Sequence, residues 1–269
     1  MTDFLILGCG YTGRRVARLL EGRNVAATSR HPESLAGLPV KAIALDVLEP
    51  GMSSRVAERL PRGIVALHSI PVLEGGIRAT PLLRPILEKA RRVIYLSTTG
   101  VYGATPIVDE ATPPRPRTQR EQLRFDEEHD IANGPWQSLI LRPAAIYGPD
   151  RGVHVSMREG RHRYWGDGSN HISRIHADDL ATITARALES EITGAYPVAD
   201  NEPATAIEIT RFCADLLGLP VPAPSAGERG DDTRGSNRRV DGRFIRQQLG
   251  VELRYPTYRE GIIAAGQSS

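Results

Sequence analysis

Three glycines near the start of the chain have the spacing of a phosphate-binding turn. Residues 8–13 read GCGYTG, which matches GxGxxG, and they lie between an apolar run at 4–7 and a helical pattern. In such a turn the first glycine permits a tight bend, the second lets a pyrophosphate approach the backbone, and the third lets helix and strand pack closely. The helix N-terminus then faces the phosphates. We therefore predict a dinucleotide site with contacts from Gly8, Gly10, Tyr11, Thr12 and Gly13.

The end of the second apolar run indicates which dinucleotide binds. Chains that prefer NAD usually place an acidic residue there, about 20 residues after the glycines, to hold the ribose 2′-hydroxyl. This chain has Ser29 and Arg30 instead, and its first acid is Glu33. Because a hydroxyl and a permanently charged guanidinium suit a 2′-phosphate, we expect NADP(H) rather than NAD. The alternative is that Arg30 is an ordinary surface arginine.

Polar residues also follow the third and fourth apolar runs. Asp46 and Val47 are candidates for the adenine pocket, and His68 and Ser69 for the edge of the nicotinamide ribose. Both pairs are equally compatible with the ordinary polarity of strand ends.

The runs that carry these residues alternate with helical patterns. They lie at 3–7, 24–29, 40–45, 64–69, 92–96 and 138–141, and they are rich in Val, Ile and Leu, as strands buried on both faces are. The alternation predicts an α/β fold, a Rossmann-type doubly wound parallel sheet with helices on both faces. After Pro149 the regularity fails. We therefore place an NADP-binding domain at 1–150 and a smaller substrate lobe at 151–269, from which about 171–200 returns to the first domain.

The composition excludes several classes of protein. With 269 residues, 25% charged, 40% hydrophobic and a net charge of +2, the chain is an ordinary globular protein. Its two cysteines are far apart, which predicts neither a disulfide nor a metal site and favours the cytoplasm. No signal-like segment or membrane span is indicated. Arginines are scattered among acids, so nucleic acid is not expected as a partner.

Four further stretches resemble the extended short-chain dehydrogenase/reductase superfamily, often labelled NAD-dependent epimerase/dehydratase. They read STTGVYG at 97–103, LRPAAIYGP at 141–149, IHADDL at 175–180 and YPVAD at 196–200. With the glycine turn, the resemblance covers about residues 1–200. It implies that Thr98 donates a hydrogen bond to the reacting oxygen and that Pro143, Ala144 and Ala145 touch the nicotinamide ring. It also implies a helix opened by residues 176–179, capped by Asp178 or Asp179, with His176 more often packed than catalytic. A homodimer is expected by resemblance only.

The catalytic pair of that superfamily is missing. The family uses a tyrosine followed four residues later by a lysine, whose charge lowers the pKa of the phenol. None of the eight tyrosines is followed four residues later by a lysine, and the sequence has no lysine after Lys89. Arg120 and Arg124 keep the spacing on the expected helix, although a guanidinium cannot act as a general base. Arg124 could bind the nicotinamide ribose or a phosphate, and Arg120 an anionic substrate. Alternatively both pair with Glu121 and Glu128 on a solvated face.

Other groups could supply a proton, and none has a stronger claim than the rest: Tyr102, His154, His162, His171 and Asp109-Glu110. The segment 151–165 contains arginines and aromatics that could bind a phosphorylated or carboxylated ligand, or could form a cover packed against its own acids. The pattern resembles the atypical branch of the superfamily. We therefore expect an NADP(H)-dependent oxidoreductase of a small carbonyl or sugar-derived compound. The alternatives are a non-catalytic NADP(H) sensor and a nucleotide-sugar epimerase or dehydratase.

Overall fold

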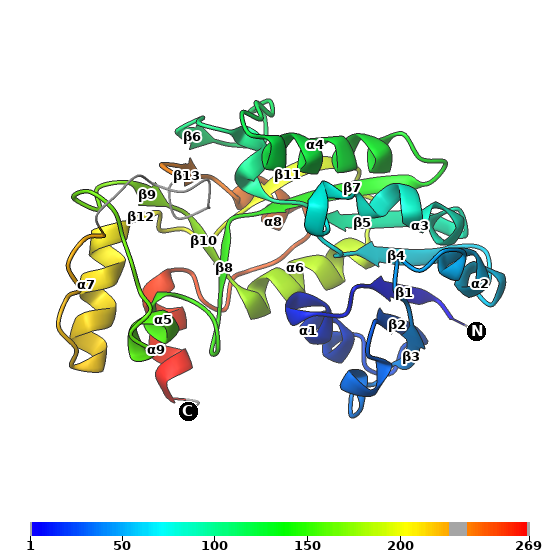
Figure 1. Ribbon diagram of the computed structural model, residues 1–269, viewed down its shortest axis with the longest axis horizontal. Helices are drawn as coiled ribbons and strands as arrows, with labels where there is room; N and C mark the ends of the chain where they lie inside the picture. The colour runs from blue at the N-terminus through cyan, green and yellow to red at the C-terminus, as the bar shows by residue number, and fades with distance from the viewer. Residues whose placement is uncertain (1, 226–235, 268–269) are drawn as a thin grey trace.

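A seven-stranded parallel sheet forms the centre of the protein, whose computed structural model describes residues 2–225 and 236–267 (Figure 1). The strand order is β11-β7-β5-β4-β1-β2-β3, with every pair parallel. The strands are β1 (Phe4–Leu7), β2 (Val25–Ser29), β3 (Lys41–Ala44), β4 (Ile64–His68), β5 (Ala90–Leu96), β7 (Gln137–Pro143) and β11 (Gly194–Val198). The predicted Rossmann-type sheet is confirmed, and six of its strands overlap the apolar runs of the sequence.

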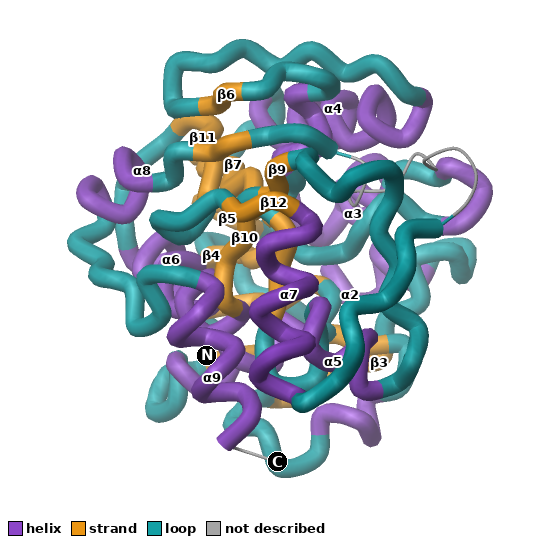
Figure 2. Tube along the Cα trace, turned by 90° about the vertical axis from the view of Figure 1, so that its left-hand side faces the viewer, coloured by secondary structure: helices purple, strands orange, loops and turns teal. Residues whose placement is uncertain are grey.

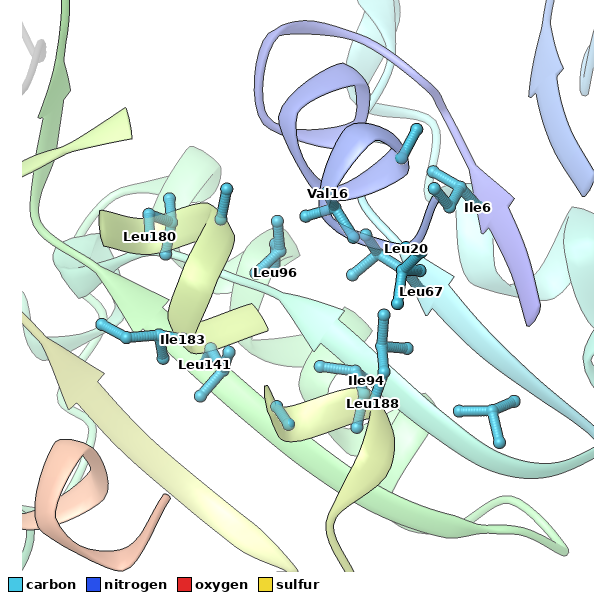
Figure 3. Close-up of a cluster of buried hydrophobic side chains, with 14 of the residues drawn as sticks. Ile6, Val16, Leu20, Leu67, Ile94, Leu96, Leu141, Leu180, Ile183 and Leu188 are labelled. Atoms are coloured by element: carbon cyan, nitrogen blue, oxygen red, sulfur yellow. The ribbon is translucent and has the colours of Figure 1, made fainter. Parts of the chain in front are cut away.

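Helices cover both faces of this sheet. On one face lie α1 (Tyr11–Leu19), α6 (Ala177–Glu189) and α8 (Arg243–Gln248); on the other lie α2 (Met52–Glu58), α3 (Ala79–Leu87) and α4 (Gln119–Ala132). Figure 3 shows the core between α1, α6 and the sheet, formed by Ile6, Val16, Leu20, Leu67, Ile94, Leu96, Leu141, Leu180, Ile183 and Leu188. This layer explains the unbroken apolar runs, because each central strand is buried on both faces. Three short 3₁₀ turns complete this part: η1 (Pro32–Leu35), η2 (Glu74–Gly76) and η3 (Thr99–Tyr102).

A smaller lobe lies beyond the carboxyl ends of the strands (Figures 1 and 2). It contains α5 (Val153–Arg158), α7 (Ala206–Leu217) and α9 (Tyr258–Gln267). Three two-stranded pairings join it to the sheet: β8 (Ala145–Tyr147) with β10 (Arg174–His176), β9 (His171–Ile172) with β12 (Ala204–Thr205), and β6 (Ile107–Val108) with β13 (Arg239–Val240). Within the described ranges no helix is long and apolar enough to cross a membrane.

Candidate functional site

The glycine turn after β1 has the open geometry that a dinucleotide requires. Gly8 adopts φ +81°, and a Cβ there would lie 2.6 Å from Ile70 Cγ1. A Cβ at Gly13 would lie 3.1 Å from the Gly8 carbonyl oxygen, where helix and strand meet. At Gly10, by contrast, an added Cβ meets nothing within 4 Å. The backbone at Gly10 is thus free for a pyrophosphate at the N-terminus of α1, and the turn fits the predicted group.

Side chains from the neighbouring strands hold this turn in place. The Gly8 N–H donates to Thr28 Oγ1 at 3.1 Å, and the Ser69 hydroxyl donates to the Gly8 carbonyl at 2.7 Å. Ser69, predicted to border the nicotinamide ribose, therefore positions the first glycine. Thr28, at the end of β2, was not singled out by the sequence, since a buried threonine in a strand has no distinguishing pattern.

The guanidinium of Arg30, just beyond β2, is exposed, and the described residues include no ion-pair partner for it. The nearest acid along the chain, Glu33, pairs with His31 at 3.3 Å. Ser29 Oγ accepts from the His31 N–H. At the end of β3, Asp46 Oδ1 accepts from Leu48 N–H at 3.0 Å, which is a turn contact. Whether these side chains contact a cofactor stays a prediction.

Thr98 begins the short turn η3 directly after β5. Its Oγ1 accepts from the Gly100 N–H at 3.1 Å, and the residue is half-buried. A hydroxyl has one donor and two acceptor positions, and no hydrogen bond within the described chain uses the Thr98 proton. The Thr98 hydroxyl can therefore donate to a ligand oxygen, as the resemblance implies. Pro143 and Ala144 are buried at the end of β7, whereas Ala145 is half-buried.

Along one face of α4, the side chains become more buried over two turns of the helix. Arg120, Arg124 and Glu128 have four-residue spacing, and they are exposed, half-buried and buried respectively. Arg124 Nη1 donates to the Tyr95 hydroxyl on β5 at 3.1 Å. The alternative in which Arg120 and Arg124 pair with Glu121 and Glu128 on a solvated face is wrong. Glu121 completes the capping box of α4 with Thr118, and Glu128 binds a different arginine.

That arginine is Arg142 on β7, which the sequence reasoning missed as a partner. Its Nη2 lies 2.7 Å from Glu128 Oε2, its Nε donates to Glu128 Oε1 at 3.0 Å, and both side chains are buried. Glu128 Oε1 also accepts from Ser97 Oγ at 2.5 Å, and Arg142 Nη1 donates to Tyr102 OH at 3.0 Å. The network ties together α4 and the residues directly before Thr98 and Pro143. The 14-residue gap between the partners left no local signal.

Two of the singled-out histidines are packed, and burial lowers the pKa of each. His68, fully buried, contacts Thr80 Oγ1 at 3.1 Å, and its pKa falls to about 3. His176 has a pKa of about 4, and its ring packs on Tyr147 and Tyr255. The expected cap by Asp178 or Asp179 is wrong: His176 Nδ1 itself accepts from the Asp178 N–H at the start of α6.

The two aspartates of this stretch have other partners. Asp178 Oδ1 accepts from Arg15 Nε at 2.9 Å, and Asp179 accepts from the N–H groups of Arg254 and Tyr255. They therefore join α6 to α1 and to the segment before α9.

A cavity of about 380 Å³ opens in the smaller lobe next to Ala145. Its wall combines aromatic and aliphatic side chains with four arginines, and includes Tyr147, Tyr164, Trp165, Ile209, Arg151, Arg161, Arg163 and Arg174. Most of the predicted Arg-rich segment 151–165 thus faces this cavity. Arg161 pairs with Glu159, and Arg163 donates to carbonyls of its own loop. The segment is thus in part packed against its own acid, whereas binding of an anionic ligand stays a prediction.

Of the other candidate proton donors, one lies in the wall of this cavity and the others lie elsewhere. His162 lines it, with Nε2 2.9 Å from Thr210 Oγ1. Tyr102 has no exposed surface and is held by Arg142, while His171 Nε2 accepts from Arg239. Asp109 accepts from Thr112 in an exposed turn. Of the groups considered, His162 is the one placed in the cavity wall.

The fold and the open glycine turn define a dinucleotide-binding α/β protein, and comparison with known proteins places it further. The profile of the NAD dependent epimerase/dehydratase family matches residues 77–199. A Streptomyces 3-diazoavenalumate denitrifying reductase is 30% identical over 147 residues, 49% of this chain and 48% of the relative. Human short-chain dehydrogenase/reductase family 42E member 1 is 25% identical over 206 residues, 64% of this chain and 50% of the relative. The chain spans about half the length of these two curated relatives.

Solved structures match the chain over nearly its whole length, and two of them are at least 25% identical in sequence. A conserved protein of unknown function from Silicibacter pomeroyi is 30% identical, with a TM-score of 0.84 and coverage of 100% of this chain and 99% of that one. A candidate NAD-dependent epimerase/dehydratase from Methylobacillus flagellatus is 25% identical, with a TM-score of 0.78 and coverage of 99% and 98%. Taken with the fold, these matches show that the chain belongs to the short-chain dehydrogenase/reductase superfamily of epimerase-like proteins.

Proposed function

We propose that this protein is an NADP(H)-dependent reductase of a small anionic carbonyl compound. The observation that carries the proposal is positional: the open turn at Gly10, the hydroxyl of Thr98 and the cavity that starts at Ala145 all follow carboxyl ends of the same parallel sheet. Ligands of open parallel sheets bind outside these ends. One edge thus offers a phosphate cradle, a donor for a carbonyl oxygen and a ligand-sized space.

The preference for NADP(H) over NAD(H) rests on the end of β2. Because Arg30 is exposed and has no acidic partner in the described chain, its guanidinium is available for a 2′-phosphate. The only acid within the next few residues, Glu33, lies 3.3 Å from His31 Nδ1. Ser29 supports the turn through the His31 N–H and presents its hydroxyl at the same edge.

The chain's own groups then bind and orient the carbonyl. NADPH, when bound, would supply the hydride that the carbonyl carbon accepts. The Thr98 hydroxyl donates to the carbonyl oxygen while Gly100 N–H fixes its Oγ1. The fixed-charge arginines at 120 and 124 cannot release the proton that completes the alcohol, so it comes from water or from another group such as His162 in the cavity wall. The half-buried Arg124 adds positive charge near β5, which favours the developing alkoxide.

Titration with NADPH and NADH tests the cofactor assignment. We expect tighter binding of NADPH, and Arg30→Ala should weaken it roughly 10- to 100-fold, as for the loss of one charge-assisted hydrogen bond, without changing NADH binding. Arg23→Ala is the matched control, since Arg23 precedes β2 and pairs with Glu189. Equal affinities for the two cofactors in the unaltered protein would reject the assignment.

Turnover is tested with a panel of aldehydes and oxo acids, followed by the absorbance of NADPH. Thr98→Val should abolish turnover and Thr98→Ser should restore it, because only the serine keeps a hydroxyl. Tyr102→Phe should leave turnover largely intact, since its phenol is buried on Arg142. Retained turnover in Thr98→Val would remove that residue from the mechanism.

A non-catalytic NADP(H) sensor is the second candidate. It is favoured by Arg124, which stands at the expected lysine position but binds the Tyr95 phenol. Tight NADPH binding without reduction of any carbonyl compound in the panel would support this function. The nucleotide-sugar epimerase or dehydratase is less well supported, because no tyrosine lies on α4 to exchange the proton.

A further inference from the structure

Arg174 differs from the other buried arginines of the described chain in having few partners. Arg142 is neutralised by Glu128, and Arg92 donates to two carbonyls and a hydroxyl at the end of α6. Arg238 binds two carbonyl groups, and Arg246 binds a carbonyl and an amide oxygen. Arg174 is only 4% exposed, yet its guanidinium makes one hydrogen bond, from Nη1 to the Ile172 carbonyl at 2.7 Å.

Arg174 also forms part of the cavity wall. A guanidinium carries five N–H donors, and Arg174 lines the cavity together with Tyr147 and Ile209. No carboxylate of the described residues lies within ion-pair distance of it. Asp200 is near enough to affect its charge, but burial raises the pKa of Asp200 to about 8, so this carboxyl group is largely protonated at neutral pH. A buried, uncompensated cation is costly unless an anion joins it.

The register of two short strands sets how far this cation lies from the reaction centre. Arg174 on β10 pairs directly with Ala145 on β8 in a parallel ladder. Directly paired residues of parallel strands project from the same face, about 4.8 Å apart at the backbone. Ala145 is one of the three residues expected beside the nicotinamide ring, and both Arg174 and Ala145 line the cavity. An acid group held by Arg174 would therefore lie within one side-chain length of a carbonyl held at that ring.

The rest of the cavity wall indicates what kind of ligand body carries the acid group and the carbonyl group. Its apolar part consists of Tyr147, Tyr164, Trp165, Ile172, Ile209 and Ile262, and its polar part of Ser156, His162 and the arginines 151, 161 and 163. The apolar part suits the apolar body of a ligand. The single buried guanidinium matches one planar, singly charged group, and carboxylate fits this fork in a bidentate manner.

We propose that the cavity binds a short oxo acid, with an aromatic or apolar body and its carboxylate close to the carbonyl, and that Arg174 selects the carboxylate. This inference rests on the proposed reductase function and names the substrate class of that site. Arg174 is a specificity-determining residue, whereas the exposed arginines 161 and 163 at the cavity are occupied by their own loop.

Calorimetric titration of the full chain loaded with NADP⁺, in which no turnover occurs, tests the inference. The probes are benzoylformate and its amide, which differ in charge at the acid position. We expect the unaltered protein to bind the acid roughly 10- to 100-fold more tightly than the amide. Arg174→Gln should remove this preference and leave amide binding within about twofold, since the apolar wall is unchanged.

Arg163→Gln is the matched control, because Arg163 also lines the cavity but is exposed and donates to carbonyls. It should keep the preference. Arg174→Lys, which retains the charge without the fork, should keep part of it, and this variant decides the test if Arg174→Gln does not fold. Equal binding of acid and amide, or a preference that survives in Arg174→Gln or is unchanged in Arg174→Lys, overturns the proposal. Tighter binding of phenyl phosphate than of benzoylformate rejects carboxylate as the group recognised.

The two proposals fail in different ways. Benzoylformate that binds through Arg174 without any oxidation of NADPH in the turnover assay rejects the reductase and keeps the ligand class of the cavity. Oxidation of NADPH by neutral ketones, with no preference for acids, keeps the reductase and rejects the role of Arg174.

Discussion

Replacing Glu128 with glutamine tests the buried network that joins α4 to the ends of β5 and β7. The carboxylate accepts from Ser97 Oγ at 2.5 Å, from Arg142 Nη2 at 2.7 Å and from Arg142 Nε at 3.0 Å. In Glu128→Gln one acceptor oxygen becomes an NH₂ group, which faces a donor, and the charge of Arg142 loses its counterion. Removing one partner of a buried ion pair costs about 3–5 kcal/mol, a large part of the stability of a typical domain.

Urea unfolding followed by circular dichroism measures this loss. Asp126→Asn is the matched control on the same helix, where Asp126 accepts only from Gln122 at a partly exposed position, and it should cost less than about 1 kcal/mol. The double variant Glu128→Leu with Arg142→Met should be more stable than Glu128→Gln, because no unpaired charge remains buried. A loss below about 1 kcal/mol in Glu128→Gln, or a double variant less stable than that single variant, would refute the reasoning.

Two further predictions concern the glycine turn and a buried acid. Gly8→Ala should lower the free energy of unfolding by roughly 2 kcal/mol, because Gly8 has φ +81° and an added Cβ would lie 2.6 Å from Ile70 Cγ1. Gly10→Ala should leave the free energy of unfolding in urea unchanged, but it should weaken NADPH binding roughly tenfold because the methyl group fills the open turn. An equal stability loss in both glycine variants would contradict this. Burial raises the pKa of Asp200 from 3.8 to about 8, so its contribution to stability is complete below pH 3.8 and is lost as pH rises toward 8. Between pH 5 and 7 the free energy of unfolding of Asp200→Asn should therefore rise, relative to that of the unaltered protein, by up to about 1.4 kcal/mol per pH unit. A difference between the two proteins that does not change with pH would show that this carboxyl group is ionised in the fold.

The elements of the sheet could be predicted because their signals are local. Six of the apolar runs became parallel strands, and the glycine spacing after the first run predicted the turn between β1 and α1. Residues 223–239 form a polar stretch rich in Pro, Gly, Ser, Arg and Asp, whose composition predicts a long loop, and most of it lies outside the described residues. The assignments of Thr98 and the cofactor contacts depend on the resemblance and stay predictions, although the geometry at Gly10 and Thr98 is compatible with both.

The errors concern side chains whose partners lie far away in the sequence. Helical spacing correctly put Arg124 and Glu128 on one face of α4, but it could not show that β5 and β7 pack against that face. The same limit applies at the start of α6, where His176 rather than an aspartate caps the helix. Local rules give the face of a helix, and the neighbouring layer then selects which of several polar partners is reached.

The sequence by itself determined the layered α/β architecture, the glycine turn and the absence of the tyrosine–lysine pair, because each is a matter of residue type and spacing along the chain. Only the tertiary structure decided the partners of the arginines. Arg142 has a buried carboxylate, Arg124 a phenol, and Arg174 a single carbonyl beside a cavity. All three have the same side chain in the sequence. Their different environments arise because burial makes the energy of a charge depend on what the fold places within a few ångströms of it.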